Sequence, residues 1–152
     1  IAIFNRSHYE DIIAVRVKKI FPDPVWKRRY KHVLDFEAML AEEGTVIIKL
    51  FLNISKAEQK KRLESRLQDP DKLWKFCMDD LDDRNRWDEF QTAYQDLIEK
   101  TSTPEAPWYI IPADRKWYRN LVVARLMVEK LRHLQLSLPT PNFDPASIII
   151  PD

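Results

Sequence analysis

Glycine is almost absent from this chain, since Gly44 is its only one among 152 residues. A phosphate-binding loop of the Gly-x-x-x-x-Gly-Lys-Ser/Thr type requires two glycines, because its backbone N–H groups turn inward around phosphate oxygens. These 152 residues therefore cannot form that loop. The composition otherwise indicates a folded domain with a sizeable core, because 45% of the residues are apolar and 32% are charged.

Charge and cysteine content exclude several classes of protein. The 25 basic and 24 acidic residues leave a net charge of +1, so no overall field favours nucleic acid or a membrane surface. No run approaches the roughly 18 apolar residues of a membrane span, and no signal peptide is visible. The lone cysteine, Cys77, excludes an internal disulfide and is typical of a reducing cytoplasm. We therefore expect a cytoplasmic protein without nucleic-acid or membrane partners.

Three short β-branched or aromatic runs alternate with helical stretches, at residues 1–4, 45–52 and 108–111. Continuous apolar runs of this kind are typical of strands buried on both faces in a parallel sheet. The alternating order predicts a three-layer α/β/α fold. Three strands are fewer than the roughly five of a typical sheet. We therefore expect further strands and the glycine-rich loop to lie upstream of Ile1.

Capping residues delimit the predicted helices. Apolar spacing predicts a helix over residues 30–43, ended by Gly44. Ser55 is expected to cap the next helix, which reaches about residue 67. Asp69 and the proline after it begin a short helix near residues 73–78.

The last third of the chain predicts two long helices and a tail. One helix is expected over residues 80–100, and its buried stripe would contain Trp87, Phe90, Tyr94 and Leu97. The other reaches about His133, and its inner face would contain Trp117, Leu121, Ala124, Val128 and Leu131. Residues 1–136 would thus form one domain with a helical lid at about residues 69–100. The proline-rich residues 137–152 are expected to be extended.

Polar residues follow the ends of the predicted strands, where open α/β sheets bind their ligands. After the first strand, Arg6 is a candidate phosphate clamp and Asn5 a candidate partner of a Mg²⁺-bound water. Glu10 lies within reach of the same strand end. Residues 53–55 and 114–116 follow the other two strands. The alternative is a turn in which Asn5 and Ser7 only cap the following segment.

Basic residues gather on the predicted lid and on the helix before it. They are Lys72, Lys75, Arg84 and Arg86, with Arg62 and Arg66 on that preceding helix. Such side chains neutralise the charge of a phosphoryl group in transfer. The alternative is a solvated helix pair with exposed ion pairs of little energetic weight. Residues 26–32 interleave aromatic and basic side chains, which is typical either of a polyanion surface or of a solvated face.

Three motifs stand in order along the chain. Phe-Asn-Arg-Ser-His-Tyr-Glu-Asp covers residues 4–11, a lid motif runs from Asp-Pro-Asp-Lys-Leu-Trp-Lys-Phe at residues 69–76 to residues 87–88, and a third motif lies within residues 101–117. In this order they resemble the family-2 polyphosphate kinases of the P-loop kinase superfamily. The resemblance extends over nearly the whole chain, to about His133.

The resemblance implies Mg²⁺-dependent transfer of a phosphoryl group between inorganic polyphosphate and a nucleotide, by a homo-oligomer. Asn5, Arg6 and Glu10 would be the catalytic residues, although many members carry Asp at the position of Asn5. The form with Glu10 is similar to the subgroup that accepts nucleoside mono- and diphosphates. The remaining site residues form two implied groups: Lys72, Lys75 and Arg84 with Arg6 for phosphates, and Arg66, Asp114 and Lys116 for the nucleotide or the site rim.

One departure from the family is large, because the glycine-rich loop and its lysine are absent from the 152 residues. Without those backbone donors, we expect this stretch alone to be inactive. The alternatives are a non-catalytic fragment or pseudoenzyme that binds polyphosphate or a partner protein, and a nucleic-acid binder that uses residues 26–32.

Overall fold

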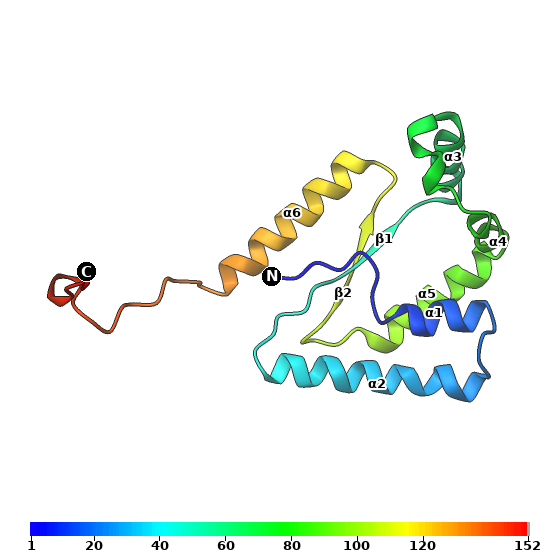
Figure 1. Ribbon diagram of the computed structural model, residues 1–152. Helices are drawn as coiled ribbons and strands as arrows, with labels where there is room; N and C mark the ends of the chain where they lie inside the picture. The colour runs from blue at the N-terminus through cyan, green and yellow to red at the C-terminus, as the bar shows by residue number, and fades with distance from the viewer. Residues whose placement is uncertain (152) are drawn as a thin grey trace.

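The computed structural model describes residues 1–151 as an α/β arrangement in which helices surround a small parallel sheet (Figure 1). Its elements in chain order are α1 (Glu10–Val17), α2 (Asp23–Glu42), β1 (Lys49–Asn53), α3 (Lys56–Gln68), the 3-10 helix η1 (Pro70–Lys75), α4 (Asp79–Asn85), α5 (Trp87–Thr101), β2 (Trp108–Pro112), α6 (Lys116–His133) and the 3-10 helix η2 (Pro145–Ser147). No helix within residues 1–151 combines the length and apolarity needed to cross a bilayer.

The sheet confirms the predicted parallel α/β pattern. Strands β1 and β2 pair in parallel, with Lys49 opposite Trp108 and Asn53 opposite Pro112. Helices α3, α4 and α5 form the crossover between the two strands. In Figure 1, α6 lies beside β2, and α1, α2 and α5 pack together on another side of the sheet.

The expected strand at residues 1–4 was wrong, because these residues form no strand and are exposed. A strand needs a neighbouring backbone to satisfy its N–H and C=O groups, and within the described residues β1 and β2 pair only with each other. The second strand also begins later than predicted, at Lys49.

The main core lies where α1, α2 and α5 meet. Ile12 of α1 and Leu97 of α5 are fully buried there, and Trp26 and Val33 of α2 pack against them. Phe90 and Tyr94 are half-buried against the same cluster, so the predicted stripe on α5 is confirmed there and at Leu97. Helix α1 and the first turns of α2 were not predicted.

Three predicted caps are present. Gly44 has φ +82°, the left-handed conformation that glycine adopts without strain, and the N–H of Thr45 donates to the Leu40 carbonyl at 2.9 Å. Because Thr45 closes this cap, it is unavailable to β1. The Ser55 hydroxyl accepts from the N–H of Glu58 at 3.1 Å, and the Asp69 carboxylate accepts from the N–H of Asp71 at 3.1 Å.

The single helix expected over residues 80–100 is two helices, α4 and α5. They meet at Arg86, whose φ of −96° and ψ of 24° lie outside the helical range. The Arg86 guanidinium donates to the Val17 carbonyl at the end of α1, at 2.9 Å. Arg86 therefore joins the lid to the core.

The face predicted to be inner on α6 was also wrong. Trp117 is 62% exposed, and Leu121 and Val128 are exposed as well. Of the predicted face Leu131 alone is half-buried, and the other half-buried apolar residues belong to the neighbouring stripe of the same helix: Val122, Val123, Leu126 and Met127. From residue 136 to residue 151 the chain forms no helix or strand except the single turn of η2, so the extended tail stays a prediction.

Candidate phosphate-transfer site

The carboxyl ends of β1 and β2 lie next to each other and are linked by one hydrogen bond. The backbone N–H of Ser55, just after β1, donates to the Asp114 carboxylate, just after β2, at 2.7 Å. This hydrogen bond lowers the pKa of Asp114. The bond brings together two of the three predicted strand-end segments.

Arg62 of α3 reinforces the same junction. Its guanidinium donates to the Ala113 carbonyl at 2.7 Å and the Asp114 carbonyl at 3.2 Å. The same side chain pairs with Glu58 at 2.8 Å, one turn earlier on α3. Arg62, which was grouped with the lid cations, thus holds the segment after β2 in place through its Nη2 group.

An open depression of about 570 Å³ lies at this edge of the sheet. Its lining includes Asn53, Lys56, Trp87, Asp114, Arg115 and Tyr118. Cationic side chains at its rim suit phosphate oxygens, and its two aromatic rings offer apolar surface to a planar group. The depression therefore has the chemistry to receive an anionic ligand that carries a ring.

Asn5 and Arg6 lie before α1 in an exposed turn. The Ser7 carbonyl accepts from the N–H of Glu10 at 3.1 Å, and the Ser7 hydroxyl accepts from the N–H of Tyr9 at 3.4 Å. Ser7 thus forms a turn just before α1, whose N-cap residue is Tyr9 and which has no side-chain cap. The Arg6 guanidinium pairs with Glu10 at 2.5 Å and is 80% exposed. This hydrogen bond raises the pKa of Arg6.

The lid residues divide into two pairs. Arg84 donates to the Lys56 carbonyl at 2.8 Å and to the Gln59 side chain at 2.9 Å, and Arg66 pairs with Asp80 at 3.3 Å. Both arginines therefore join α3 to α4, and Arg84 does so at Lys56, which lines the strand-end depression. Lys72 pairs with Asp69, and the Lys75 ammonium lies 5.0 Å from the centre of the Trp74 ring.

The structure gathers only part of the predicted site. Asp114 and Arg84 lie at the two sides of the junction between β1 and α3, while Lys116 begins α6 two residues after Asp114. Within residues 1–151, no described hydrogen bond or ion pair joins Arg6 or Glu10 to that group. Their assignment to one site stays a prediction.

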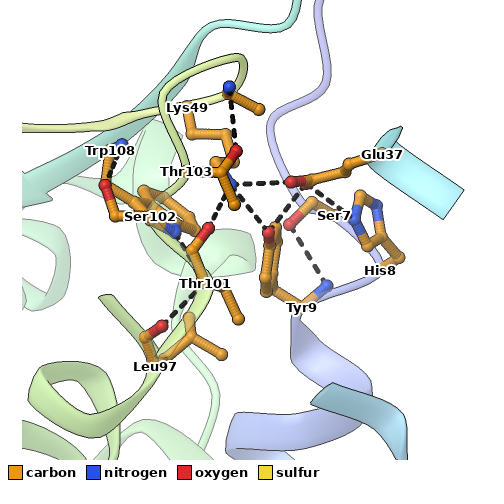
Figure 2. A network of polar contacts seen from close by, with 11 residues as sticks. Ser7, His8, Tyr9, Glu37, Lys49, Leu97, Thr101, Ser102, Thr103 and Trp108 are labelled. Carbon is orange, nitrogen blue, oxygen red and sulfur yellow. Dashed lines mark hydrogen bonds and ion pairs between the residues drawn. The ribbon is translucent and has the colours of Figure 1, made fainter. Parts of the chain in front are cut away.

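A buried polar network lies beneath α1, and the sequence analysis missed it (Figure 2). Lys49 donates to the Glu37 carboxylate at 2.7 Å and to the Thr101 carbonyl at 2.6 Å. The Tyr9 hydroxyl donates to Glu37 at 2.7 Å and lies 3.1 Å from the Lys49 ammonium, which donates to it. The side chains of Lys49 and Glu37 are 5% and 4% exposed.

Burial shifts the pKa of two members of this network, Lys49 and Tyr9. Desolvation lowers the pKa of Lys49, and the neighbouring Glu37 opposes that shift. The pKa of Tyr9 is raised, first by desolvation and then by its hydrogen bond to Glu37. Tyr9 is therefore a neutral hydrogen-bond donor. The signal in the sequence was Lys49 itself, the one charged residue in the apolar run of residues 46–52.

The described residues contain no group of three or more His, Cys, Asp and Glu side chains arranged to hold a metal ion. Hard oxygen donors are nevertheless present at the start of α1, in the amide of Asn5 and the carboxylate of Glu10. Mg²⁺ commonly binds proteins through one or two such groups and takes its other oxygens from phosphates and water. This donor set fits a metal of that kind.

Comparison with known proteins identifies related chains. The family model for polyphosphate kinase 2 matches residues 1–138. The AMP/ADP-polyphosphate phosphotransferase of Meiothermus ruber is 53% identical over 150 residues, which cover 99% of this chain and 56% of that protein. The ADP-polyphosphate phosphotransferase of Rhodopseudomonas palustris is 37% identical over 151 residues, which cover 91% of this chain and 52% of that protein.

A solved structure agrees with both relatives. The crystal structure of polyphosphate kinase 2 from Arthrobacter aurescens superposes with a TM-score of 0.89 at 47% sequence identity, over 95% of this chain and 51% of that one. The chain therefore spans about half the length of these two phosphotransferases and of the crystallised kinase.

Proposed function

The chain belongs to the polyphosphate kinase 2 family, and on that premise we propose that its protein transfers a phosphoryl group between inorganic polyphosphate and AMP or ADP. The observation that carries this proposal is the 53% identity to an AMP/ADP-polyphosphate phosphotransferase over 99% of the chain. The matched 150 residues span the segments that carry the first motif and the lid motif, which argues against a purely non-catalytic role. A cytoplasmic homo-oligomer is part of the same proposal.

Charge neutralisation is the main task of the proposed site. Phosphoryl transfer needs little covalent chemistry from the protein, so positioning and electrostatic stabilisation carry the rate. Arg6 would hold phosphate oxygens with its exposed fork of N–H donors. Lys72, Lys75 and Arg84 would neutralise the phosphate chain from the lid, without a covalent intermediate.

The nucleotide would lie at the strand-end depression. Asp114 lines this depression, and Arg66 on α3 and Lys116 at the start of α6 would complete the nucleotide side of the site. The rings of Trp87 and Tyr118 in its lining offer a surface for the base.

Mg²⁺ is the proposed metal, and Asn5 with Glu10 would hold it. When bound, Mg²⁺ would neutralise part of the negative charge of the phosphates. Because Glu10 pairs with Arg6 at 2.5 Å, Glu10 also keeps the guanidinium at the end of the turn that precedes α1.

We further propose that residues 1–152 are inactive by themselves, because they contain no glycine-rich loop to surround a phosphate with backbone N–H groups. The test compares the full-length protein with this stretch, each given polyphosphate, Mg²⁺ and AMP or ADP, with the nucleotides separated by chromatography. Product from the full-length protein alone is expected.

Two other outcomes would contradict the proposed function. Full-length protein that binds polyphosphate without forming nucleotide product would be a binding module. Tight, salt-sensitive binding to DNA together with indifference to polyphosphate would indicate a nucleic-acid binder that uses residues 26–32.

Arg84→Ala is expected to lower the turnover of the full-length protein by about ten- to a hundredfold, because it removes a cation from the lid. Its stability should change little, since Arg84 donates only to a carbonyl and a glutamine side chain at the surface. Steady-state kinetics and urea unfolding measure the two effects. Gln59→Ala is the control, because it removes one of these hydrogen bonds and keeps the cation. Unfolding of the variant with full activity per folded molecule would make Arg84 structural.

A further inference from the structure

We propose that Tyr9 is a positioning residue, held by Glu37 and Lys49, that fixes the phosphate-binding turn at residues 5–8. Tyr9 contacts no substrate in this proposal and acts through Arg6. The inference rests on the proposed function, because it requires Arg6 to act on a phosphate.

The turn at residues 5–8 has few attachments to the rest of the molecule. Residues 1–8 are all exposed, whereas Tyr9 is 5% exposed. Among the described contacts, Arg6 reaches only Glu10 in the next turn of the chain. His8 lies 3.4 Å from the Glu37 carboxylate, and its ring contacts Phe36 of the same helix. The turn is therefore connected to the core through the side chains of His8 and Tyr9, and both side chains contact Glu37.

The Tyr9 side chain contacts several elements at once. Its hydroxyl meets Glu37 of α2 at 2.7 Å and Lys49 of β1 at 3.1 Å (Figure 2). Lys49 in turn donates to the Thr101 carbonyl at the end of α5, at 2.6 Å. The Tyr9 ring packs against Trp108 of β2 with ring centres 4.9 Å apart. A hydroxyl held in this way has one position relative to the sheet.

A fixed Tyr9 restricts Arg6, which is only three residues away. Three residues reach at most about 10 Å even when fully extended. The hydrogen bonds that Ser7 accepts from the N–H groups of Tyr9 and Glu10 shorten that reach further. Because misplacing a catalytic group by about 1 Å can cost a hundredfold in rate, the buried network under α1 sets where the guanidinium acts.

Tyr9→Phe tests the proposal with the smallest available change, because it removes one hydroxyl and keeps the ring. In the full-length protein we expect kcat to fall about tenfold, through a looser turn. The KM for the nucleotide should stay within about twofold, since the nucleotide would bind at the other end of the proposed site.

Asp96→Asn is the matched control, because it weakens a tie at the other end of α1. Arg16 of α1 pairs with Asp96 of α5 at 2.6 Å, far along the helix from the turn. We expect Asp96→Asn to lower the urea midpoint of unfolding about as much as Tyr9→Phe does. Its kcat should stay at the wild-type value. A third variant, Tyr9→Phe with Glu37→Met and Lys49→Met, replaces the three polar side chains of the network by apolar ones. Its urea midpoint should exceed that of Tyr9→Phe, while its kcat should stay as low.

The outcomes separate this inference from the proposed function. A wild-type protein that transfers no phosphate would overturn both. An active wild-type protein with unchanged kcat in Tyr9→Phe would overturn the inference alone. So would an equal loss of kcat in Asp96→Asn, or a kcat that returns together with stability in the triple variant.

Discussion

Lys49→Met lowers the free energy of unfolding of the full-length protein by about 3–5 kcal/mol, the expected cost of leaving one partner of a buried ion pair alone. The Glu37 carboxylate, 4% exposed, would lose its cation at 2.7 Å. It would keep only the Tyr9 hydroxyl and the partly exposed His8 ring as polar neighbours. Urea unfolding followed by circular dichroism measures the change.

Two controls locate the cause of that loss. Lys31→Met removes an exposed ion pair with Asp35, 2.5 Å long, and should cost less than about 1 kcal/mol. Lys49→Met combined with Glu37→Met should recover most of the loss, because replacing both charges removes the desolvation cost along with the attraction. If Lys49→Met alone lowered the free energy of unfolding no more than Lys31→Met does, the buried ion pair between Lys49 and Glu37 would be contradicted.

Arg6→Ala lowers the turnover of the full-length protein by about a hundred- to a thousandfold, the usual cost of removing one preorganised donor from a charged transition state. Stability should hardly change, because the Arg6 guanidinium is 80% exposed and pairs only with Glu10. Single-turnover kinetics at saturating polyphosphate measure the chemical step.

Arg6→Lys distinguishes charge from geometry. Lysine keeps the positive charge and loses the planar fork that holds two phosphate oxygens. We expect it to recover part of the lost rate and no more. Lys31→Ala removes a similar exposed i,i+4 pair elsewhere and should leave turnover at the wild-type level. Equal rates for Arg6→Ala and wild type would remove Arg6 from the catalytic residues.

Local signals in the sequence predicted the helix caps well. Gly44, Ser55 and Asp69 each form the cap that their residue type favours. Such signals depend on a few neighbouring residues, and tertiary contacts rarely override them. The parallel pairing of β1 and β2 also follows from two apolar runs separated by helices.

Apolar periodicity could not show which face of α6 is covered. Trp117, Leu121 and Val128 have helical spacing and are exposed, while the neighbouring stripe from Val122 to Met127 is half-buried. Two adjacent apolar stripes give the same spacing, so only the neighbouring element decides between them. Residues 1–4 are a similar case, because their composition favours a strand but a strand also needs a partner.

The candidate site was predictable only in part, because its supporting contacts join residues far apart in the sequence. Arg62 and Arg86 looked like ligand-facing cations, yet they bind carbonyls at the ends of β2 and α1. Lys49 was visible as a charge inside an apolar strand, but its partner Glu37 was one of many acidic residues on helices. The sequence pattern therefore showed which charged residues matter, but only the folded structure shows which groups they bind.

Transfer of label from polyphosphate to nucleotide is the most direct test of the proposed function. Full-length protein is mixed with radiolabelled polyphosphate, unlabelled ADP and Mg²⁺, and the products are separated. We expect label in the terminal phosphate of ATP, at a rate that Arg6→Ala reduces and Asp96→Asn does not. Label that remains in polyphosphate, or appears only as inorganic phosphate, would contradict phosphoryl transfer to a nucleotide.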